Sequence, residues 1–318
     1  MIDRRSLLAA AGAAAAWPAE AKPGAAPTDL TGVWTNAWYT RLQRPRAFET
    51  LAVSPAEAEA YEAPRRAHKG ELISKQDLLG QNESEFPDNG PGLARIHGEI
   101  RSSWIVDPPD GRIPWTDAAK KRLPIVAEPP DVYDNVEDRE TDERCLTTTG
   151  GSAPIINSHD GNVVQIVQAP GWLAIVGEKN HEVRLVRIVS AGEPRPTPGA
   201  DPRLRDWQGE SVGRWEGATL VVETYGLRAG ATKMDDNVYF TEHTRVVERF
   251  TRSGPGEIAY GFTVEDPTLF TRAWRAEMVF RAEPRGIFEY ACHEGNYSLP
   301  GILRAARAAD GKASAGGK

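Results

Sequence analysis

Histidine is the side chain best suited to acid–base chemistry near neutral pH, and the chain contains six. His181 follows Glu178 by three residues, in a stretch whose pattern predicts two β-strands, Trp172 to Glu178 and His181 to Arg187. A two-residue turn at Lys179-Asn180 would make Glu178 and His181 cross-strand neighbours. We therefore expect Glu178 to orient the His181 imidazole as an acid–base couple, with a structural ion pair as the alternative.

A second histidine, His293, follows Cys292 at the end of a predicted strand that begins at Ile287. Ligands enter β-barrels at strand ends and loops, so we expect His293 or Tyr297 to be a second proton donor near His181. The alternative is that each histidine ends a strand and satisfies backbone carbonyls. On the first interpretation, the catalytic residues are His181, Glu178, His293 and Tyr297.

Arginine and tryptophan side chains provide most of the predicted substrate contacts. An arginine can bind a carboxylate through two parallel hydrogen bonds, which suggests an anionic substrate group, although arginines on a sheet also serve as cross-strand partners. Tryptophans can line a pocket for an aromatic or apolar ligand, or fill a barrel core. A side-chain amide near the C-terminus adds a hydrogen-bond donor. The predicted substrate-binding residues are Arg184, Arg214, Trp207, Trp215, Trp274 and Asn296.

Motifs for metals and redox cofactors are absent from the sequence. There is no H-E-x-x-H or C-x-x-C, so Glu178, His181 and His293 could bind a metal only by long-range convergence, and we predict no metal. No G-x-G-x-x-G occurs either, and we expect no cofactor. Ser211, flanked by glycines two residues away on each side, precedes a predicted strand rather than a helix, which disfavours a serine hydrolase.

The first residues have the order of an export signal. Arg4-Arg5 precede the alanine-rich apolar run Leu7 to Ala16, and Ala19-Glu20-Ala21 is a small-x-small cleavage site. The paired arginines favour the twin-arginine route, with an ordinary secretory signal as the alternative. We predict a signal peptide at residues 1–21, a linker at 22–29 and a periplasmic or secreted mature protein. No later apolar run is long enough for a bilayer span.

The two cysteines are Cys145 and Cys292. In an oxidising compartment a widely separated pair is expected to form a disulfide, which by loop-closure entropy would contribute up to about 4–5 kcal/mol. The alternative is a catalytic thiol beside His293.

Short β-branched or aromatic segments separated by turn residues predict a mainly β fold. We expect an antiparallel β-barrel or sandwich with a few short helices, in one domain of residues 30–306 followed by a disordered tail at 307–318. Helices are predicted after N-caps at Ser54, ending before Gly70, and at Thr116, and over Ile302 to Ala309. Later strands are predicted at Val163 to Gln168, Thr244 to Thr251, Glu257 to Val264 and Trp274 to Arg281, with a hairpin turn at Glu216-Gly217.

The net charge of −7, without a basic patch interleaved with aromatics, makes nucleic acid an unexpected partner. We expect a small molecule instead. One hypothesis is a cofactor-independent enzyme, of lyase, decarboxylase, hydratase or hydrolase type, acting on a small aromatic compound by His/Glu acid–base chemistry. The alternative is a periplasmic binding protein for an apolar ligand.

Five motifs occur together in the chain: Ile105 to Pro114; Glu143 to Leu146; Gln165 to Gln168 with Pro170-Gly171, Glu178, His181 and Arg184; Gly213 to Gly217 with Leu220 to Thr224; and Glu289 to Tyr297. Together they resemble a large family of exported bacterial proteins. The resemblance covers most of Trp104 to Ala306, implies an exported single-family domain and carries no catalytic assignments. Members tend to have histidine where this chain has Arg245, so no site is expected there. Gly32-Val33-Trp34 is similar to the opening Gly-x-Trp of lipocalins, which also implies a β-barrel.

Overall fold

The structure is a computed structural model that describes residues 28–74, 90–127, 135–139, 141–147, 150–158, 161–190, 205–229, 232–233 and 238–316. The predicted signal peptide and most of the predicted linker lie outside these residues. The strands are β1 (Gly32–Thr35), β2 (Ala52–Val53), β3 (Arg95–Ile96), β4 (Glu99–Arg101), β5 (Ile105–Asp107), β6 (Val163–Ala169), β7 (Trp172–Gly177), β8 (Val183–Ile188), β9 (Glu210–Glu216), β10 (Thr219–Tyr225), β11 (Thr232–Lys233), β12 (Val238–Tyr239), β13 (Arg245–Gly254), β14 (Glu257–Glu265) and β15 (Trp274–Ala282). The helices are α1 (Pro55–Ser74), α2 (Asp117–Ala127), α3 (Cys292–Gly295) and α4 (Ser298–Gly316).

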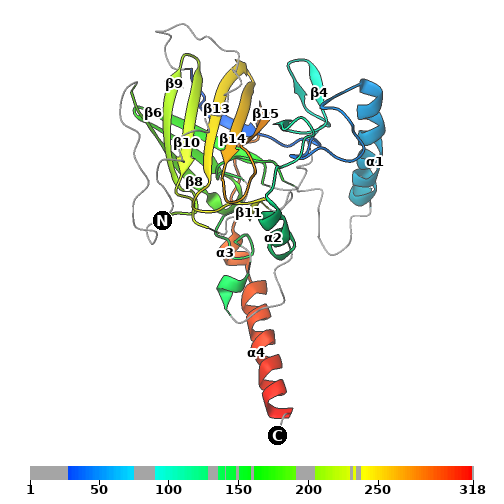
Figure 1. Ribbon diagram of the computed structural model, residues 1–318, viewed down its shortest axis with the longest axis vertical. Coiled ribbons are helices and arrows are strands. Elements are labelled where there is room, and N and C mark those ends of the chain that lie inside the picture. The colour runs from blue at the N-terminus through cyan, green and yellow to red at the C-terminus, as the bar shows by residue number, and fades with distance from the viewer. Residues whose placement is uncertain are drawn as a thin grey trace, which may run out of the picture.

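A closed barrel of nine strands forms the centre of the molecule (Figure 1). The strands follow the order β1-β6-β7-β8-β9-β10-β13-β14-β15, and β1 closes the circle by pairing with β15 at Trp34 and Ala282. The predicted mainly β barrel is confirmed. Its strands are not all antiparallel, because β8 and β9 pair in parallel, with Val186 opposite Ser211.

Side chains fill the barrel interior. Along β13, inward residues such as Val246 and Phe250 are buried and alternate with less buried outward residues, as the period of a strand requires. The Tyr260 ring at the centre lies 4.9 Å from the ring of Phe250 and 5.3 Å from that of Phe280. The interior is therefore an aromatic core, and a ligand would have to bind at an end of the barrel.

One barrel end is closed by the buried segment 150–158. The backbone N–H of Ile155 donates to the Tyr260 hydroxyl at 2.9 Å, which places this segment inside the ring of strands. Gly151 lies against Gly177 at the end of β7, so the closed end is the one that carries the β7–β8 turn. The opposite end carries the β6–β7 turn and stays free of this segment.

Helix starts agree with the capping signals in the sequence. Ser54 and Glu57 form a reciprocal capping box at the start of α1, and the Thr116 hydroxyl accepts from the Ala119 N–H at the start of α2. The helix ends differ from expectation: α1 continues to Ser74 rather than ending before Gly70. None of the described helices has the length and apolar character that a bilayer span requires.

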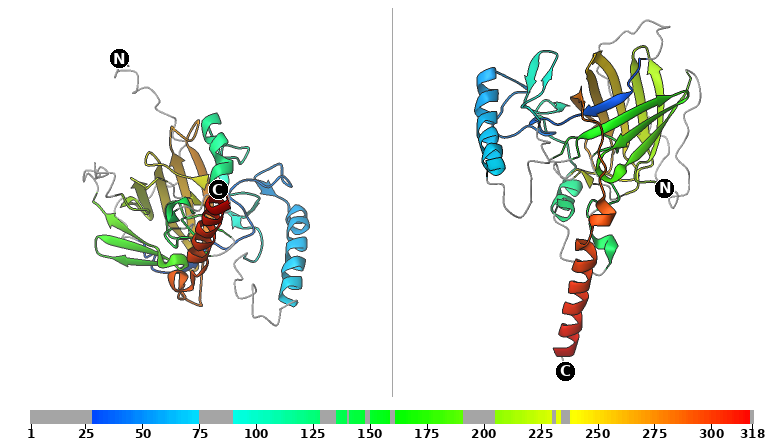
Figure 2. Two further views of the ribbon diagram at one scale, coloured as in Figure 1. Left: turned by 90° about the horizontal axis from the view of Figure 1, so that it is seen from below. Right: turned by 180° about the vertical axis from the view of Figure 1, so that it is seen from behind.

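The C-terminal part differs most from the prediction. Ile287 to Cys292, predicted as a strand, is not one, and the barrel closes without it through the β1–β15 pairing. Helix α4 begins at Ser298 and continues to Gly316, where a short helix and a disordered tail were predicted. The alanine-rich sequence favours helix, and α4 projects away from the barrel (Figures 1 and 2).

Candidate functional site

The predicted cross-strand pairing of Glu178 and His181 is wrong. Strand pairing in the β7–β8 hairpin ends at Val176 and Val183, and both candidate residues lie in the connecting loop, where Lys179–His181 forms a 3₁₀ turn. The buried Lys179 ammonium reaches the Asp142 carboxylate at 3.2 Å, and Asn180 adopts a left-handed conformation. This long-range ion pair holds the loop in a wider turn than the two-residue turn expected from local sequence.

Glu178 and His181 both bind the backbone of the C-terminal segment instead. Glu178 Oε2 accepts a hydrogen bond from the Phe288 N–H at 2.9 Å, and His181 Nε2 accepts one from the Tyr290 N–H at 3.1 Å. His181 is exposed. The two side chains therefore act as acceptors that fix residues 287–290 beside the hairpin loop.

The other two predicted catalytic residues do not join them in a pocket. His293 is exposed in α3, and the side chain of Tyr297 is 82% exposed. The predicted disulfide between Cys145 and Cys292 is confirmed, with the two Cα atoms 5.9 Å apart, which removes the alternative of a catalytic thiol. The disulfide ties the C-terminal segment to the loop at residues 141–147.

Beside the disulfide lies a cleft of about 670 Å³. Two of its acidic side chains have structural partners: Asp142 pairs with Lys179, and Glu143 pairs with Arg139 at 2.9 Å. Asn296, a predicted substrate-binding residue, lines this cleft, but its amide donates to the Glu143 carbonyl at 2.6 Å. The cleft is lined by Asp142, Glu143, Glu289, Tyr290, Ala291, Cys292, Gly295, Asn296, Ser298, Leu299 and Ile302.

Arg184 lines neither the cleft beside the disulfide nor the cavity beside the β6–β7 turn, contrary to its predicted role as a substrate clamp. It is buried in the barrel, where its guanidinium forms a two-pronged ion pair with the buried Glu248. The Tyr260 hydroxyl donates to the same carboxylate at 2.8 Å. Burial lowers the pKa of Arg184, but the charge and hydrogen bonds of Glu248 outweigh it and raise the pKa overall, so the guanidinium stays charged. Burial is also the main cause that raises the pKa of Tyr260 well above its usual value.

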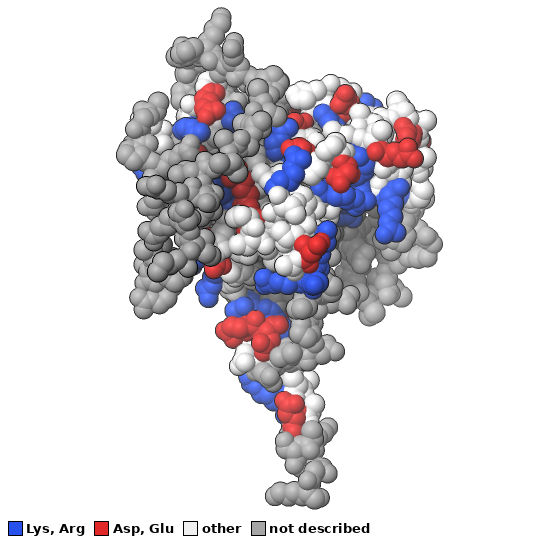
Figure 3. All heavy atoms as spheres, viewed as in Figure 1, with Lys and Arg blue, Asp and Glu red and all other residues white. Residues whose placement is uncertain are grey.

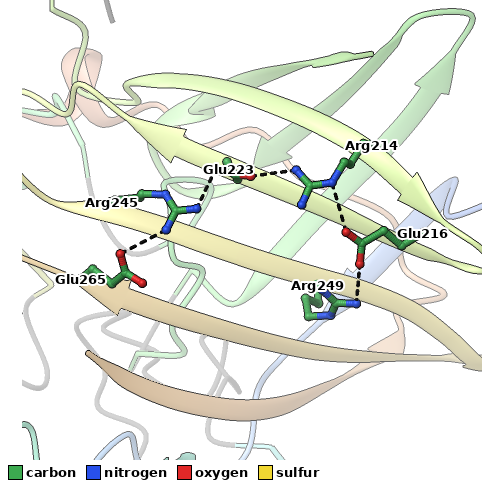
Figure 4. Close-up of polar contacts among 6 residues, drawn as sticks. All are labelled: Arg214, Glu216, Glu223, Arg245, Arg249 and Glu265. Atoms are coloured by element: carbon green, nitrogen blue, oxygen red, sulfur yellow. Dashed lines mark hydrogen bonds and ion pairs between the residues drawn. The ribbon is translucent and has the colours of Figure 1, made fainter. Parts of the chain in front are cut away.

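Arg214, the other predicted anion clamp, belongs to a ladder of alternating charges on the outside of the barrel (Figure 4). It donates to Glu223 at 2.8 Å and to Glu216 at 3.1 Å. Arg245 donates to the same Glu223 at 2.8 Å. The Glu223 hydrogen bond is the largest cause that raises the pKa of Arg214. Ladder partners thus already hold the guanidinium of Arg214. The ladder consists of Arg214, Glu216, Glu223, Arg245, Arg249 and Glu265.

The three predicted ligand-binding tryptophans have three different environments. Trp274 is fully buried in the core, 5.6 Å from the ring of Phe262. Trp207 stacks under the guanidinium of Arg228 at 4.8 Å. None of the three lines the cleft beside the disulfide, and of the three only Trp215, at the end of β9, lines the cavity beside the β6–β7 turn.

That cavity, which we call the barrel mouth, lies at the open end beside the β6–β7 turn. Its volume is about 370 Å³, and its walls are mostly apolar. The side-chain oxygen of Gln168 accepts from the Leu30 N–H at 3.2 Å, while the amide NH₂ makes no hydrogen bond within the described residues. The barrel mouth is lined by Gln168, Ala169, Pro170, Gly171, Leu173, Ile188 and Trp215.

Sequence reasoning did not identify Gln168, Leu173 or Ile188 as site residues. Alternation along β6 places Gln168 on the inward face with Val164 and Ile166. A polar residue at an inward-facing position near a strand end could therefore have indicated a binding residue. The convergence with Ile188 and Trp215 depends on the parallel pairing of β8 and β9, which local sequence does not reveal.

Ser211 has a structural role. The surrounding Gly-Glu-Ser-Val-Gly segment has the G-x-S-x-G spacing, but it lies in β9 rather than in a strand-to-helix turn. Ser211 is buried, and its hydroxyl shares a hydrogen bond of 2.8 Å with Thr224. The structure therefore agrees with the expectation that Ser211 is not an exposed nucleophile.

Comparison of the chain with protein-family models, with curated proteins and with solved structures gives no match. Function is therefore inferred from the geometry of the barrel.

Proposed function

We propose that this protein is an exported small-molecule-binding protein that holds its ligand in the barrel mouth. The single observation that carries the proposal is the composition of this cavity, in which the apolar side chains of Leu173, Ile188 and Trp215 lie beside Gln168, whose NH₂ makes no hydrogen bond within the described residues. Small-molecule sites have this character: mostly apolar walls with few polar groups that fix orientation. The Cys145–Cys292 disulfide supports the exported part of the proposal, since disulfides persist in oxidising compartments.

The ligand that fits this cavity is a small aromatic or apolar molecule with one hydrogen-bond acceptor. Trp215 offers an indole surface for an aromatic ring, and the Gln168 NH₂ offers a donor to a carbonyl, carboxylate or phenolate oxygen. A volume of about 370 Å³ lies near the lower end of small-molecule sites. This favours a ligand of one or two rings over an extended lipid.

Binding is favoured over catalysis because no residue that lines the barrel mouth titrates near neutral pH. General acid–base chemistry needs such a group within hydrogen-bonding reach of the reacting atom. The Glu178 and His181 side chains, on which the enzymatic hypothesis depends, instead hold the backbone of Phe288 and Tyr290.

The proposal is tested by titrating the mature, disulfide-bonded protein with a two-ring fluorescent aromatic anion such as naphthalene-2-sulfonate. We expect saturable binding that Trp215→Ala weakens at least about tenfold, the equivalent of about 1.4 kcal/mol. Gln168→Met should weaken binding of an anionic probe more than that of a matched neutral probe. The control is Trp207→Ala, which removes a tryptophan outside the cavity and should leave the affinity unchanged. Equal affinities of the wild type and the Trp215→Ala variant would reject the barrel mouth as the site.

A further inference from the structure

The outer surface of the barrel is charged over one set of strands and apolar over another. Over β9, β10, β13 and β14, the outward side chains include the charge ladder of Figure 4, and acidic and basic atoms interleave on the face shown in Figure 3. Over β6, β7 and β8, which are nearest the viewer in the rear view of Figure 2, the outward positions are almost all apolar. We call this second surface the apolar wall. Its outward positions are Gln165, Val167, Ala169, Trp172, Ala174, Val176, Val183, Leu185 and Arg187.

The apolar wall is open to solvent. Val167 is 41% exposed, Trp172 is 48% exposed and Leu185 is 59% exposed. Strand register places Val167, Ala174 and Leu185 side by side in one row across the three strands. Contiguous exposed apolar surface on a protein indicates a contact that covers it.

We propose that the apolar wall is the contact surface of a homodimer in which it packs against the same wall of a second copy. The barrel is closed by the β1–β15 pairing, so these strands lie within the ring of strands and not at the edge of an open sheet. A partner must therefore pack face to face, with side chains interdigitated at a sheet separation of about 10 Å.

Charge permits a second copy as the occupant. The chain has a net charge of −7, so contacts between most of its surfaces are repulsive. The apolar wall carries one charged residue, Arg187, at its margin, and it can meet itself without bringing like charges together at its centre. A two-fold contact uses the same patch on both copies, which requires this self-complementarity.

The shape of the apolar wall favours a second copy of the chain. In the central row the small Ala174 lies between the larger Val167 and Leu185, and neighbouring strands are about 4.8 Å apart. A two-fold axis parallel to the strands and midway between Ala174 and Leu185 brings Leu185 of each copy over the depression at Ala174 of the other. Three strands of about six residues cover roughly 300 Å² in projection, which is less than the roughly 800 Å² per partner of a standard interface. We therefore expect a weak dimer that dissociates on dilution.

The test is sedimentation velocity of the mature full-length protein from about 1 to about 300 µM. We expect a reversible shift from monomer to dimer, and Leu185→Lys should raise the dissociation constant at least about tenfold because it places a charge in the apolar contact. Val167→Lys, at the other end of the row, is a second variant should the first not fold, and an unchanged melting temperature establishes folding. Val136→Lys is the matched control, since Val136 is exposed at 38% but lies outside the apolar wall.

Three results would overturn the proposal. The first is a wild-type protein that stays monomeric over the whole range. The second is a folded Leu185→Lys variant that dimerises as tightly as the wild type. The third is a wild-type dimer that dissociates when its apolar wall binds uncharged phosphatidylcholine vesicles, because the occupant would then be a membrane rather than a second copy.

Discussion

Removing the negative charge from the buried ion pair should strongly destabilise the barrel. The side chains of Arg184 and Glu248 are 1% and 0% exposed, and the guanidinium donates to both oxygens of the carboxylate. Glu248→Gln keeps the shape of the side chain but leaves the Arg184 charge buried without its counter-charge. Loss of one partner from a buried pair costs about 3–5 kcal/mol, which is a large share of the stability of a typical domain.

The assay is urea unfolding followed by circular dichroism and tryptophan fluorescence. We expect Glu248→Gln to lower the free energy of unfolding by about 3 kcal/mol or more. The double variant Arg184→Met/Glu248→Gln should be more stable than Glu248→Gln alone, since it leaves no unpaired buried charge. Glu265→Gln, at the half-exposed end of the outer ladder, is the control and should lower the free energy of unfolding by less than about 1 kcal/mol. A loss below about 1 kcal/mol for Glu248→Gln, or a double variant less stable than the single one, would refute this account of the core.

Three further predictions follow from the other contacts. Reduction of the Cys145–Cys292 disulfide should lower stability by up to about 4–5 kcal/mol and increase protease cleavage after residue 283; unchanged cleavage would contradict a tethering role. His181→Ala should speed amide hydrogen exchange at Tyr290 while the melting temperature of the barrel stays the same, whereas loss of a catalytic turnover would favour the enzymatic hypothesis instead. Burial raises the pKa of Asp266, but hydrogen bonds from threonine residues outweigh it and lower the pKa overall. Its stabilisation should therefore be complete above the unfolded value of about 3.9 and be lost as the pH falls through the folded pKa, and Asp266→Asn should remove this part of the acid dependence of unfolding.

Much of the barrel could be predicted from sequence because strand alternation is a local signal. β14 and β15 each begin at the predicted residue and end one residue later than predicted, and β13 begins one residue late and ends three residues late. The hairpin turn was predicted one residue early: Glu216 pairs with Thr219, so the turn is Gly217-Ala218. The disulfide was predictable because a chain with two cysteines and an expected export signal has one intramolecular pairing to form.

Features that depend on distant residues could not be predicted. The loop around His181 is set by the ion pair of Lys179 with Asp142, which lies 37 residues away in sequence. The β-branched and aromatic residues of Ile287 to Cys292 resemble a strand, yet β1 and β15 already close the barrel and leave no edge for it. Arg184 was predicted to bind a ligand because its ion-pair partner, Glu248, lies 64 residues away in sequence. No local pattern indicates that these two residues pair.

The central claim is that the barrel mouth, rather than the cleft beside the disulfide, binds the ligand. Its most direct test is a nuclear magnetic resonance titration of the isotope-labelled mature protein with the fluorescent probe used above. We predict that the largest shift changes occur at the Gln168 side-chain NH₂, the Trp215 indole N–H and the methyl groups of Leu173. If the largest shift changes occur at Tyr290 and Leu299 and the barrel-mouth resonances do not shift, the account is contradicted and binding is assigned to the cleft beside the disulfide.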